Sequence, residues 1–205
     1  MDKRISRQYF NNAAPHWDET VRNNDPVKLR AMAERIAFPP DARVLDAGAG
    51  TGVFAPYIQS KLNSSGRIAC VDFAYNMLEI AQKKNGNKGI EHVCAEIETV
   101  GFVGSLFDAV VCYSTFPHFH EKLLALENIY NLLKAGGKVF ICHTASRNEI
   151  NAIHRKIPDL RDHLIPEGDV MRDMLTAAGF GEVSIIDNAG YYLAEAKKPL
   201  SISKK

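Results

Sequence analysis

Residues 44–52 read Val-Leu-Asp-Ala-Gly-Ala-Gly-Thr-Gly, an apolar run that passes directly into three glycines spaced two residues apart. The apolar start is typical of a buried parallel strand. The glycines lack the β-carbons that would keep a ligand away from the backbone of the following turn. We therefore expect a strand, a glycine turn and a helix over residues 51–62, built around a nucleoside-type cofactor. The three glycines are Gly48, Gly50 and Gly52.

The spacing of the glycines distinguishes between nucleotide-binding motifs. The dinucleotide fingerprint G-x-G-x-x-G needs its third glycine one residue later, where this chain has Val53. The turn also lacks the Gly-Lys-Ser/Thr ending of a phosphate-binding P-loop. What remains is the pattern E/D-x-G-x-G-x-G, which begins here at Asp46.

Length and composition indicate one ordinary globular domain. The chain has 205 residues, of which 46% are hydrophobic and 24% charged, and its formal net charge is +1. This charge offers no basic field for nucleic acid, and no stretch approaches the roughly 20 apolar residues that span a bilayer. The polar start of the chain is unlike a signal peptide. We therefore expect a cytoplasmic protein without a nucleic-acid or membrane partner, in which residues 199–205 form a basic tail.

Strand-like and helical patterns alternate along the chain, which implies a parallel sheet covered on both faces. Three residues separate the last two strands, too few for a crossover, so the last strand must run antiparallel to the one before it. The expected strands are 43–47, 67–72, 90–95, 108–113, 138–143, 182–187 and 191–196. The clearest expected helices are 27–37, 121–133 and 169–178.

An alternating body that ends in a β-hairpin and carries this glycine motif resembles the class I S-adenosylmethionine-dependent methyltransferases. The resemblance covers roughly residues 40–198. It implies a Rossmann-like α/β fold with a seven-stranded, mostly parallel sheet, a reversed last strand and helices on both faces.

The N-terminal segment is aromatic and contains Tyr9, Phe10 and Trp17. Such segments are similar to the lids of small-molecule methyltransferases related to the ubiquinone/menaquinone C-methyltransferases. We expect a single domain over residues 1–205, with a helical lid over 1–40 and a catalytic body over 41–198. Plain packing of an extra helix is the alternative role of the aromatic residues.

Residues that follow the strands are expected to bind S-adenosyl-L-methionine, because ligands of an open parallel sheet lie outside the carboxyl ends of its strands. The glycine turn can donate amides to a carboxylate, with Asp46 at the amino-acid end of the cofactor. Asp72 can accept both ribose hydroxyl protons, and capping the next helix is a compatible second role. The resemblance implies that Met77 packs on adenine and that Glu96 accepts from its amino group, where the family more often has Asp. The predicted cofactor-binding set is Asp46, Gly48, Ala49, Gly50, Gly52, Asp72, Phe73, Met77, Glu96, Ile97, Tyr113 and Ser114.

Histidines gather after the fourth and fifth strands. His118 and His120 follow the fourth strand, His143 ends the fifth, and a helix with a capping box at 146–149 places His154 on an inward stripe. Three interpretations stay open: a base for a phenol, enol or similar acceptor, satisfied core histidines, or a divalent-metal site. The H-x-H spacing is no recognised metal signature, so no metal is expected. The predicted catalytic residues are His143, as first choice, with His118 and His154.

The sequence thus predicts an S-adenosylmethionine-dependent methyltransferase that methylates carbon or oxygen of a small-molecule acceptor by in-line displacement. Enzymes that methylate amino-nucleobases or amides carry D/N-P-P-Y/F, whereas residues 114–117 read Ser-Thr-Phe-Pro, so those acceptors are disfavoured. One alternative is an NAD-dependent oxidoreductase, which Val53 and the terminal hairpin argue against. Another is a non-catalytic module that binds the cofactor. Basic residues over 146–167 are expected to form a solvated face, with contact to an anionic or phenolic acceptor as the alternative.

Overall fold

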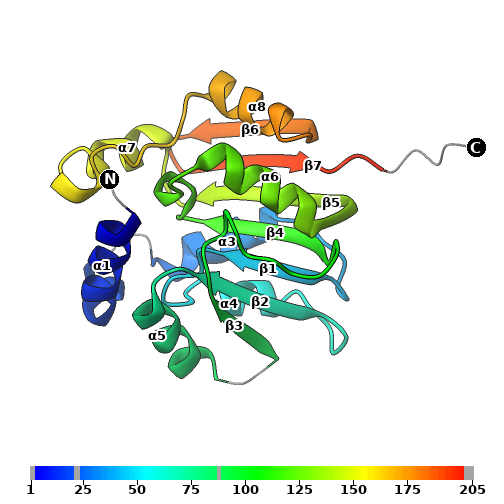
Figure 1. Cartoon of the computed structure of the whole chain (residues 1–205), viewed down its shortest axis with the longest axis horizontal. Coiled ribbons are helices and arrows are strands. Elements are labelled where there is room, and N and C mark those ends of the chain that lie inside the picture. The colour runs from blue at the N-terminus through cyan, green and yellow to red at the C-terminus, as the bar shows by residue number, and fades with distance from the viewer. Residues whose placement is uncertain (1–2, 21–23, 87–88, 201–205) are drawn as a thin grey trace, which may run out of the picture.

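The computed structural model describes residues 3–20, 24–86 and 89–200. A seven-stranded sheet with the order β3-β2-β1-β4-β5-β7-β6 forms its centre (Figure 1). The neighbours from β3 to β5 pair in parallel, and β7 runs antiparallel to both β5 and β6. The strands are β1 Arg43–Ala47, β2 Arg67–Asp72, β3 Ile90–Cys94, β4 Phe107–Tyr113, β5 Leu133–His143, β6 Gly181–Asn188 and β7 Tyr191–Lys197. The predicted fold class, with its reversed last strand, is confirmed.

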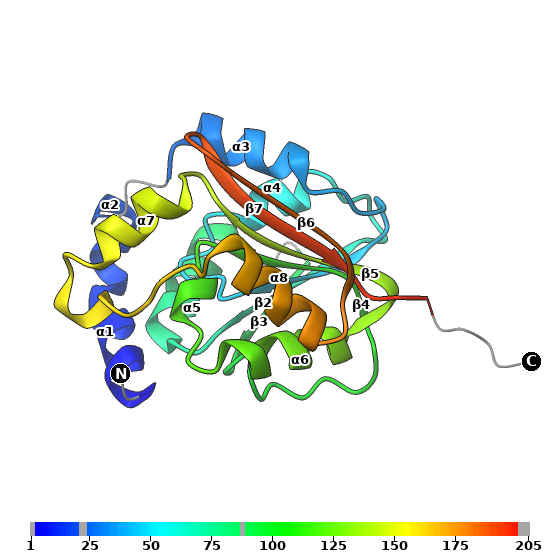
Figure 2. The same cartoon turned by 90° about the horizontal axis from the view of Figure 1, so that it is seen from above.

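Helices cover both faces of this sheet (Figure 2). One face carries α3 (Pro26–Arg35) and α4 (Ala55–Gln59), and the other carries α6 (Lys122–Leu132) and α8 (Gly168–Ala177). Helix α5 (Tyr75–Asn85) packs beside β2 and β3. Beyond the carboxyl ends of the parallel strands lie α1 (Lys3–Ala13), α2 (Trp17–Thr20) and α7 (Arg147–His154), as Figure 1 and Figure 2 show. Short 3-10 turns complete the chain at η1 (Ala14–His16), η2 (Phe116–His118) and η3 (Pro158–Leu160).

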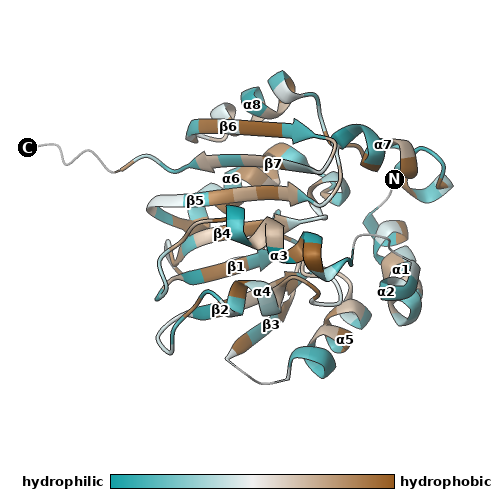
Figure 3. Cartoon of the chain, turned by 180° about the vertical axis from the view of Figure 1, so that it is seen from behind, coloured by the Kyte–Doolittle hydropathy of each residue, from teal (hydrophilic) through white to brown (hydrophobic). Residues whose placement is uncertain are grey.

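The central strands are buried on both faces, which explains their continuous apolar runs. Val44 and Leu45 of β1 are both fully buried, but they face opposite sides. Val44 packs in the core beneath α3 and α4, whereas Leu45 packs in the core beneath α6 and α8. Figure 3 shows hydrophobic segments on several strands of the sheet, among them β1, β5 and β6. Within the described part of the chain, no helix is long and apolar enough to cross a membrane.

Two elements have boundaries that differ from the sequence expectation by more than two residues. The helix expected over 51–62 is shortened to α4, because residues 51–54 still belong to the glycine turn. Strand β5 begins at Leu133 rather than at 138, and its pairing with β4 shifts register between Phe107 and Ala109. Gly136 adopts φ +81 within this irregular part. The glycine pair at 136–137 therefore lies inside a bulged strand and not in a loop.

The segment predicted as a lid divides into two parts. Helix α3 packs on the sheet through Leu29, Met32 and Ala33, so it is part of the body. Residues 3–20 instead lie across the carboxyl ends of the strands, where Phe10 is only 6% exposed. The lid thus stays a prediction for residues 3–20. Helix α3, which was expected to be part of the lid, instead packs as part of the body. Residues 201–205 of the expected basic tail lie outside the described residues.

Candidate active site

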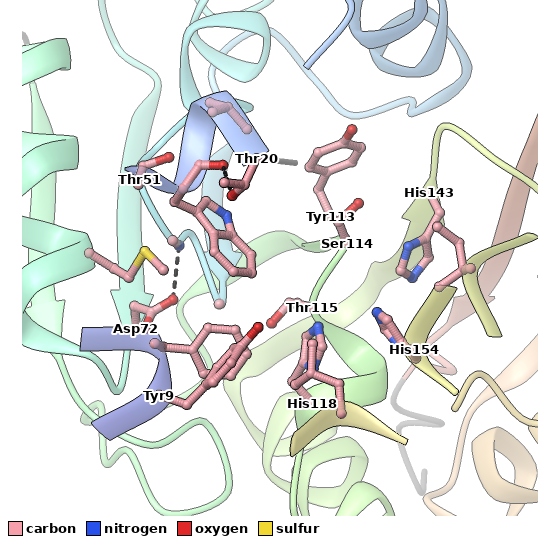
Figure 4. Close-up of a pocket in the computed structure, with 18 of the residues that line it drawn as sticks. Tyr9, Thr20, Thr51, Asp72, Tyr113, Ser114, Thr115, His118, His143 and His154 are labelled. Carbon is pink, nitrogen blue, oxygen red and sulfur yellow. Dashed lines mark hydrogen bonds between the residues drawn. The ribbon is translucent and has the colours of Figure 1, made fainter. Parts of the chain in front are cut away.

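A cavity of about 410 Å³ opens at the carboxyl ends of β1, β2, β4 and β5. The glycine turn and the strand ends form one side, and α1, α2 and α7 with η3 form the other (Figure 4). Its volume is in the usual range for small-molecule sites. The lining residues are Tyr9, Phe10, Trp17, Thr20, Asn24, Gly48, Gly50, Thr51, Val53, Asp72, Phe73, Met77, Tyr113, Ser114, Thr115, His118, His143, Ile150, Ile153, His154, Ile157 and Leu160.

Asp72 connects the glycine turn to the start of α5. Its Oδ2 accepts the amide of Gly50 at 2.8 Å, and its Oδ1 accepts the amide of Ala74 at 2.8 Å. Each carboxylate oxygen keeps a further acceptor site, so these bonds leave room for ribose hydroxyls. Burial raises the pKa of Asp72 to about 6, against the opposing effect of the backbone amides of Ala74, Gly50 and Phe73.

Asp46, Ala49 and Gly52 were predicted to contact the cofactor, but they do not line the cavity. They pack on the other side of the glycine turn. Asp46 is 1% exposed, and its Oδ2 has no hydrogen-bond partner among the described residues. Burial, and then the charge of Asp72, raises the pKa of Asp46 to about 7. Ala49 is buried, and Gly52 faces Ala81 and Asn85 of α5. The remaining residues of the predicted set line this cavity or the one beside it.

A second cavity of about 40 Å³ adjoins the first and shares Gly48, Asp72 and Phe73 with it. Glu96 and Ile97 line this smaller cavity. The Glu96 carboxylate also holds α1, because it pairs with Lys3 Nζ at 2.9 Å and with Arg7 Nη2 at 2.7 Å. The N-terminal helix therefore closes over the end where adenine is expected.

Asp18 fastens the other end of the N-terminal segment to the glycine turn. Its Oδ1 accepts the hydroxyl of Thr51 at 2.5 Å, and its Oδ2 accepts Lys84 Nζ at 2.5 Å. Tyr9, Phe10 and Trp17 line the cavity at the position expected for a lid. Asp18 was not among the predicted site residues, because nothing in the local pattern indicates its distant partners.

Three imidazoles lie across the cavity from Asp72 and Thr51 (Figure 4). His118 belongs to η2, His143 ends β5, and His154 ends α7, whose predicted capping box is confirmed. Burial lowers the pKa of all three, that of His143 to about 3. The structure thus brings the three predicted histidines together as neutral rings.

Two other histidines differ from the sequence expectation. His120 does not line the larger cavity, and its Nδ1 lies 3.3 Å from the Glu121 carboxylate. His163 was not predicted as a site residue, yet its Nδ1 lies 2.9 Å from His118 Nδ1 and its carbonyl accepts from His154 Nδ1. The segment around His163 has no regular hydrophobic period from which the position of its side chain could have been predicted. Within the described ranges, no group of three or more His, Cys, Asp or Glu side chains is arranged to hold a metal ion.

Apart from His154, the side of the cavity formed by α7, η3 and the residues between them is apolar, and it is lined by Ile150, Ile153, Ile157 and Leu160. The basic residues of this segment point elsewhere. Arg155, Lys156 and Arg161 are exposed, and Arg147 pairs with Glu167 and Asp187. Among the described residues that line the cavity, Asp72 is the one Asp, Glu, Lys or Arg. The lining therefore offers no cation to an anionic acceptor.

Comparison with known proteins agrees with this geometry. Residues 45–141 match the family model described as a methyltransferase domain. The ubiquinone/menaquinone biosynthesis C-methyltransferase of Wigglesworthia glossinidia brevipalpis is 36% identical over 106 residues, which cover 50% of this chain and 42% of that protein. The malonyl-[acyl-carrier protein] O-methyltransferase of Bacillus cereus is 26% identical over 157 residues, 75% of this chain and 57% of that protein. The chain spans about half the length of these relatives.

Solved structures share the whole architecture. A putative S-adenosyl-L-methionine-dependent methyltransferase from Methanococcus maripaludis has a TM-score of 0.74 at 23% identity, over 94% of this chain and 95% of that one. A putative methyltransferase solved in complex with the Haloferax volcanii activator Trm112 has a TM-score of 0.76 at 15% identity, over 93% and 97%. Together with the sheet order, these structures show that the chain has the fold of the class I S-adenosylmethionine-dependent methyltransferases, and its residues 45–141 match a methyltransferase-domain model.

The raised pKa of Asp72 predicts a pH-dependent cofactor affinity. Ribose hydroxyls donate to the ionised carboxylate, so affinity for S-adenosylhomocysteine should rise from about pH 5 to about pH 7, by up to about tenfold for each pH unit below the pKa. The contribution of Asp72 to the stability of the free protein has the opposite trend, because a folded-state pKa raised to about 6 contributes stability below the unfolded value that is lost as the pH rises. Calorimetric titrations across this range check the prediction, and a flat profile would contradict it.

Proposed function

We propose that this protein transfers a methyl group from S-adenosyl-L-methionine to carbon or oxygen of a small, uncharged and largely apolar acceptor. The observation that carries the proposal is a single cavity with Asp72 and the glycine turn at one end and three neutral imidazoles at the other. An acceptor among the imidazoles would lie in the same enclosed space as the donor, which in-line displacement requires.

The chain offers suitable groups along the length of the cofactor. Amides of the glycine turn suit the methionine carboxylate, and Asp72 suits the ribose. Phe73 and Met77 provide apolar surface for adenine, toward Glu96. Bound there, the cofactor supplies an activated methyl group on its sulfonium. The open space above Gly50, where an added β-carbon would meet nothing within 4 Å, fits a ligand that approaches the backbone.

The acceptor is inferred from the lining of the opposite end. Apolar residues from α7 and η3 suit a hydrocarbon or aromatic body, and the three imidazoles suit one polar group. The absence of a lining cation within the described part of the chain disfavours carboxylates and phosphates. Because the relatives include a C-methyltransferase and an O-methyltransferase by name, we retain both carbon and oxygen as candidate acceptor atoms. A cytoplasmic location without nucleic acid or membrane as partner belongs to this proposal.

Methyl transfer is tested most simply with S-adenosylmethionine labelled in its methyl group. Neutral phenols and enolisable diketones form the first acceptor panel, and benzoates and phosphate monoesters form the charged comparison. Labelled product from the neutral panel is the expected result. Tight S-adenosylhomocysteine binding without transfer to any acceptor would favour the non-catalytic module, and stabilisation by NADH alone would favour the oxidoreductase.

His143 is expected to contact the acceptor, because both of its ring nitrogens are buried without a partner among the described residues. His143→Ala should lower turnover by about 100-fold, the lower range for a lost acid-base group, and leave S-adenosylhomocysteine affinity nearly unchanged. His16→Ala, at a highly exposed ring in η1, is the control. Loss of cofactor affinity in a folded His143→Ala protein would contradict this role.

A further inference from the structure

His118 and His163 form a direct ring-to-ring hydrogen bond, with 2.9 Å between their Nδ1 atoms. Such a bond requires one ring to carry the hydrogen and the other to offer a lone pair. His118 lines the cavity, whereas His163 does not and is half-buried beside it. The pair therefore connects the inside of the cavity with the outer side of its wall.

We propose that His118 and His163 form a proton relay that removes the proton released when the acceptor is methylated. The relay rests on the proposed methyl transfer and deepens it, because it assigns the route by which the proton leaves. Sequence reasoning placed His118 at the acceptor, but the structure adds a partner that does not touch the cavity.

Both rings are neutral at the beginning and at the end of the step, but each ends as its other tautomer. The acceptor gives its proton to His118 Nε2 as the carbon–oxygen or carbon–carbon bond to the methyl group forms and the carbon–sulfur bond breaks. His118 passes its Nδ1 proton to His163 Nδ1, and His163 releases its Nε2 proton to water. The electron pair of the broken bond stays on sulfur, which becomes the neutral thioether of S-adenosylhomocysteine. After the product leaves, His118 Nε2 gives a proton to water, the shared proton returns to His118 Nδ1, and His163 Nε2 takes a proton from water, which restores the starting tautomers.

The surroundings favour neutral rings. Burial lowers the pKa of both histidines, that of His163 to about 4. His143 and His154 lie on the same side of the cavity as His118, with the His154 ring centroid 5.0 Å from that of His118, and Lys122 of α6 acts against a positive charge on His118 or His163. Asp162 acts in the opposite sense on His163. A relay in which the two rings only exchange tautomers avoids placing a positive charge beside Lys122.

His154 has a different part in this arrangement. Its Nδ1 donates to the carbonyl of His163, because a carbonyl can only accept. The neutral ring then leaves Nε2 as an acceptor, and it cannot pass a proton onward through the carbonyl. His154 is therefore a positioning residue that fixes the backbone of His163 beside His118.

The relay restricts the acceptors that are expected for this protein to those that release a proton. It serves substrates whose reacting atom loses a proton on methylation, such as the hydroxyl of a phenol or enol, or a carbon that becomes acidic beside it. Thioethers and tertiary amines have no such proton, so they gain nothing from the pair. The neutral, apolar lining of the cavity fits the first group.

Nitrogen-15 NMR of histidine-labelled protein bound to S-adenosylhomocysteine tests the pair without any acceptor. Between about pH 6 and pH 8, near the ordinary histidine pKa, both rings should stay neutral, and a through-hydrogen-bond coupling should join the two Nδ1 atoms. His163→Ala should remove the coupling and identify its partner. Protonation of either ring at neutral pH, or two rings that both carry hydrogen only on Nε2, would overturn the relay.

Kinetics test the function of the pair with an acceptor from the neutral phenol panel. His163→Ala should lower turnover by about tenfold or more with an unchanged KM for the cofactor, and added imidazole should restore much of the loss. The His16→Ala control should keep the native turnover, and added imidazole should not change that turnover. Unchanged turnover, or a loss that imidazole does not restore, would overturn the relay while leaving methyl transfer intact. Absence of transfer by the native protein would instead overturn the proposed function, and the relay with it.

Discussion

Replacing Gly48 by alanine is expected to destabilise the fold and to remove cofactor binding. An added β-carbon would lie 1.9 Å from Thr115 Oγ1 and 2.6 Å from its Cβ, and the residue has φ +72, where a side chain is strained. Overpacking and backbone strain each cost about 1–3 kcal/mol, so the free energy of unfolding should fall by about 2–6 kcal/mol. Chemical denaturation and calorimetry with S-adenosylhomocysteine measure the two effects.

Gly50→Ala is the matched control, because this glycine shares the left-handed backbone but not the crowding. It has φ +54, and no atom lies within 4 Å of an added β-carbon. The free protein should therefore lose only about 1 kcal/mol from backbone strain. Cofactor affinity should still fall, because the methyl group would occupy cavity space beside the turn. If Gly50→Ala bound S-adenosylhomocysteine as tightly as the native protein, the ligand would not lie against this turn.

Asp72→Ala is expected to weaken S-adenosylhomocysteine binding by about 1–3 kcal/mol, roughly a 5- to 150-fold rise in Kd, through loss of charged hydrogen bonds. The same change removes the acceptor for the amides of Gly50 and Ala74, so the turn itself also loosens. Asp72→Asn keeps the volume and one acceptor oxygen, and its effect should be smaller. Isothermal calorimetry near neutral pH compares the variants.

Asp25→Ala is a control for Asp72→Ala, because it removes a helix cap without removing a contact to the ligand. Asp25 accepts the amide of Val27 at 2.9 Å as the N-cap of α3, and it does not line the cavity. Its loss should reduce stability by about 1 kcal/mol and leave cofactor affinity unchanged. Equal affinity losses in Asp25→Ala and Asp72→Ala would show that Asp72 acts only through the stability of its turn.

The sheet could be predicted from the sequence because residues that are adjacent in the chain indicate each of its strands. Buried parallel strands such as the one containing Ala109–Cys112 are continuous apolar runs, and the short link before Tyr191 leaves no room for a crossover. The stripe on α7 was predictable for the same reason: the capping box at Ser146 fixes the register, and Ile150 and His154 then share one face. The order of strands along the chain also placed Asp72 at the edge where ligands bind.

Contacts between distant segments could not be predicted in this way. Glu96 was expected to face adenine, but the structure shows that Lys3 and Arg7, about 90 positions earlier, pair with the same carboxylate. His163 lies in an irregular segment, so no period indicated that its ring meets His118. Asp46 stands at the end of β1 as the motif requires, yet the packing of the turn places it beneath the cavity.

Calorimetric titration of the native protein with S-adenosylhomocysteine and, separately, with NADH tests the central claim most directly. We expect one S-adenosylhomocysteine to bind per chain, with an affinity that Gly50→Ala and Asp72→Ala both reduce, and we expect no binding of NADH. Binding of NADH, or of S-adenosylhomocysteine with an affinity that neither substitution changes, would contradict the assignment of this cavity to the methyl donor.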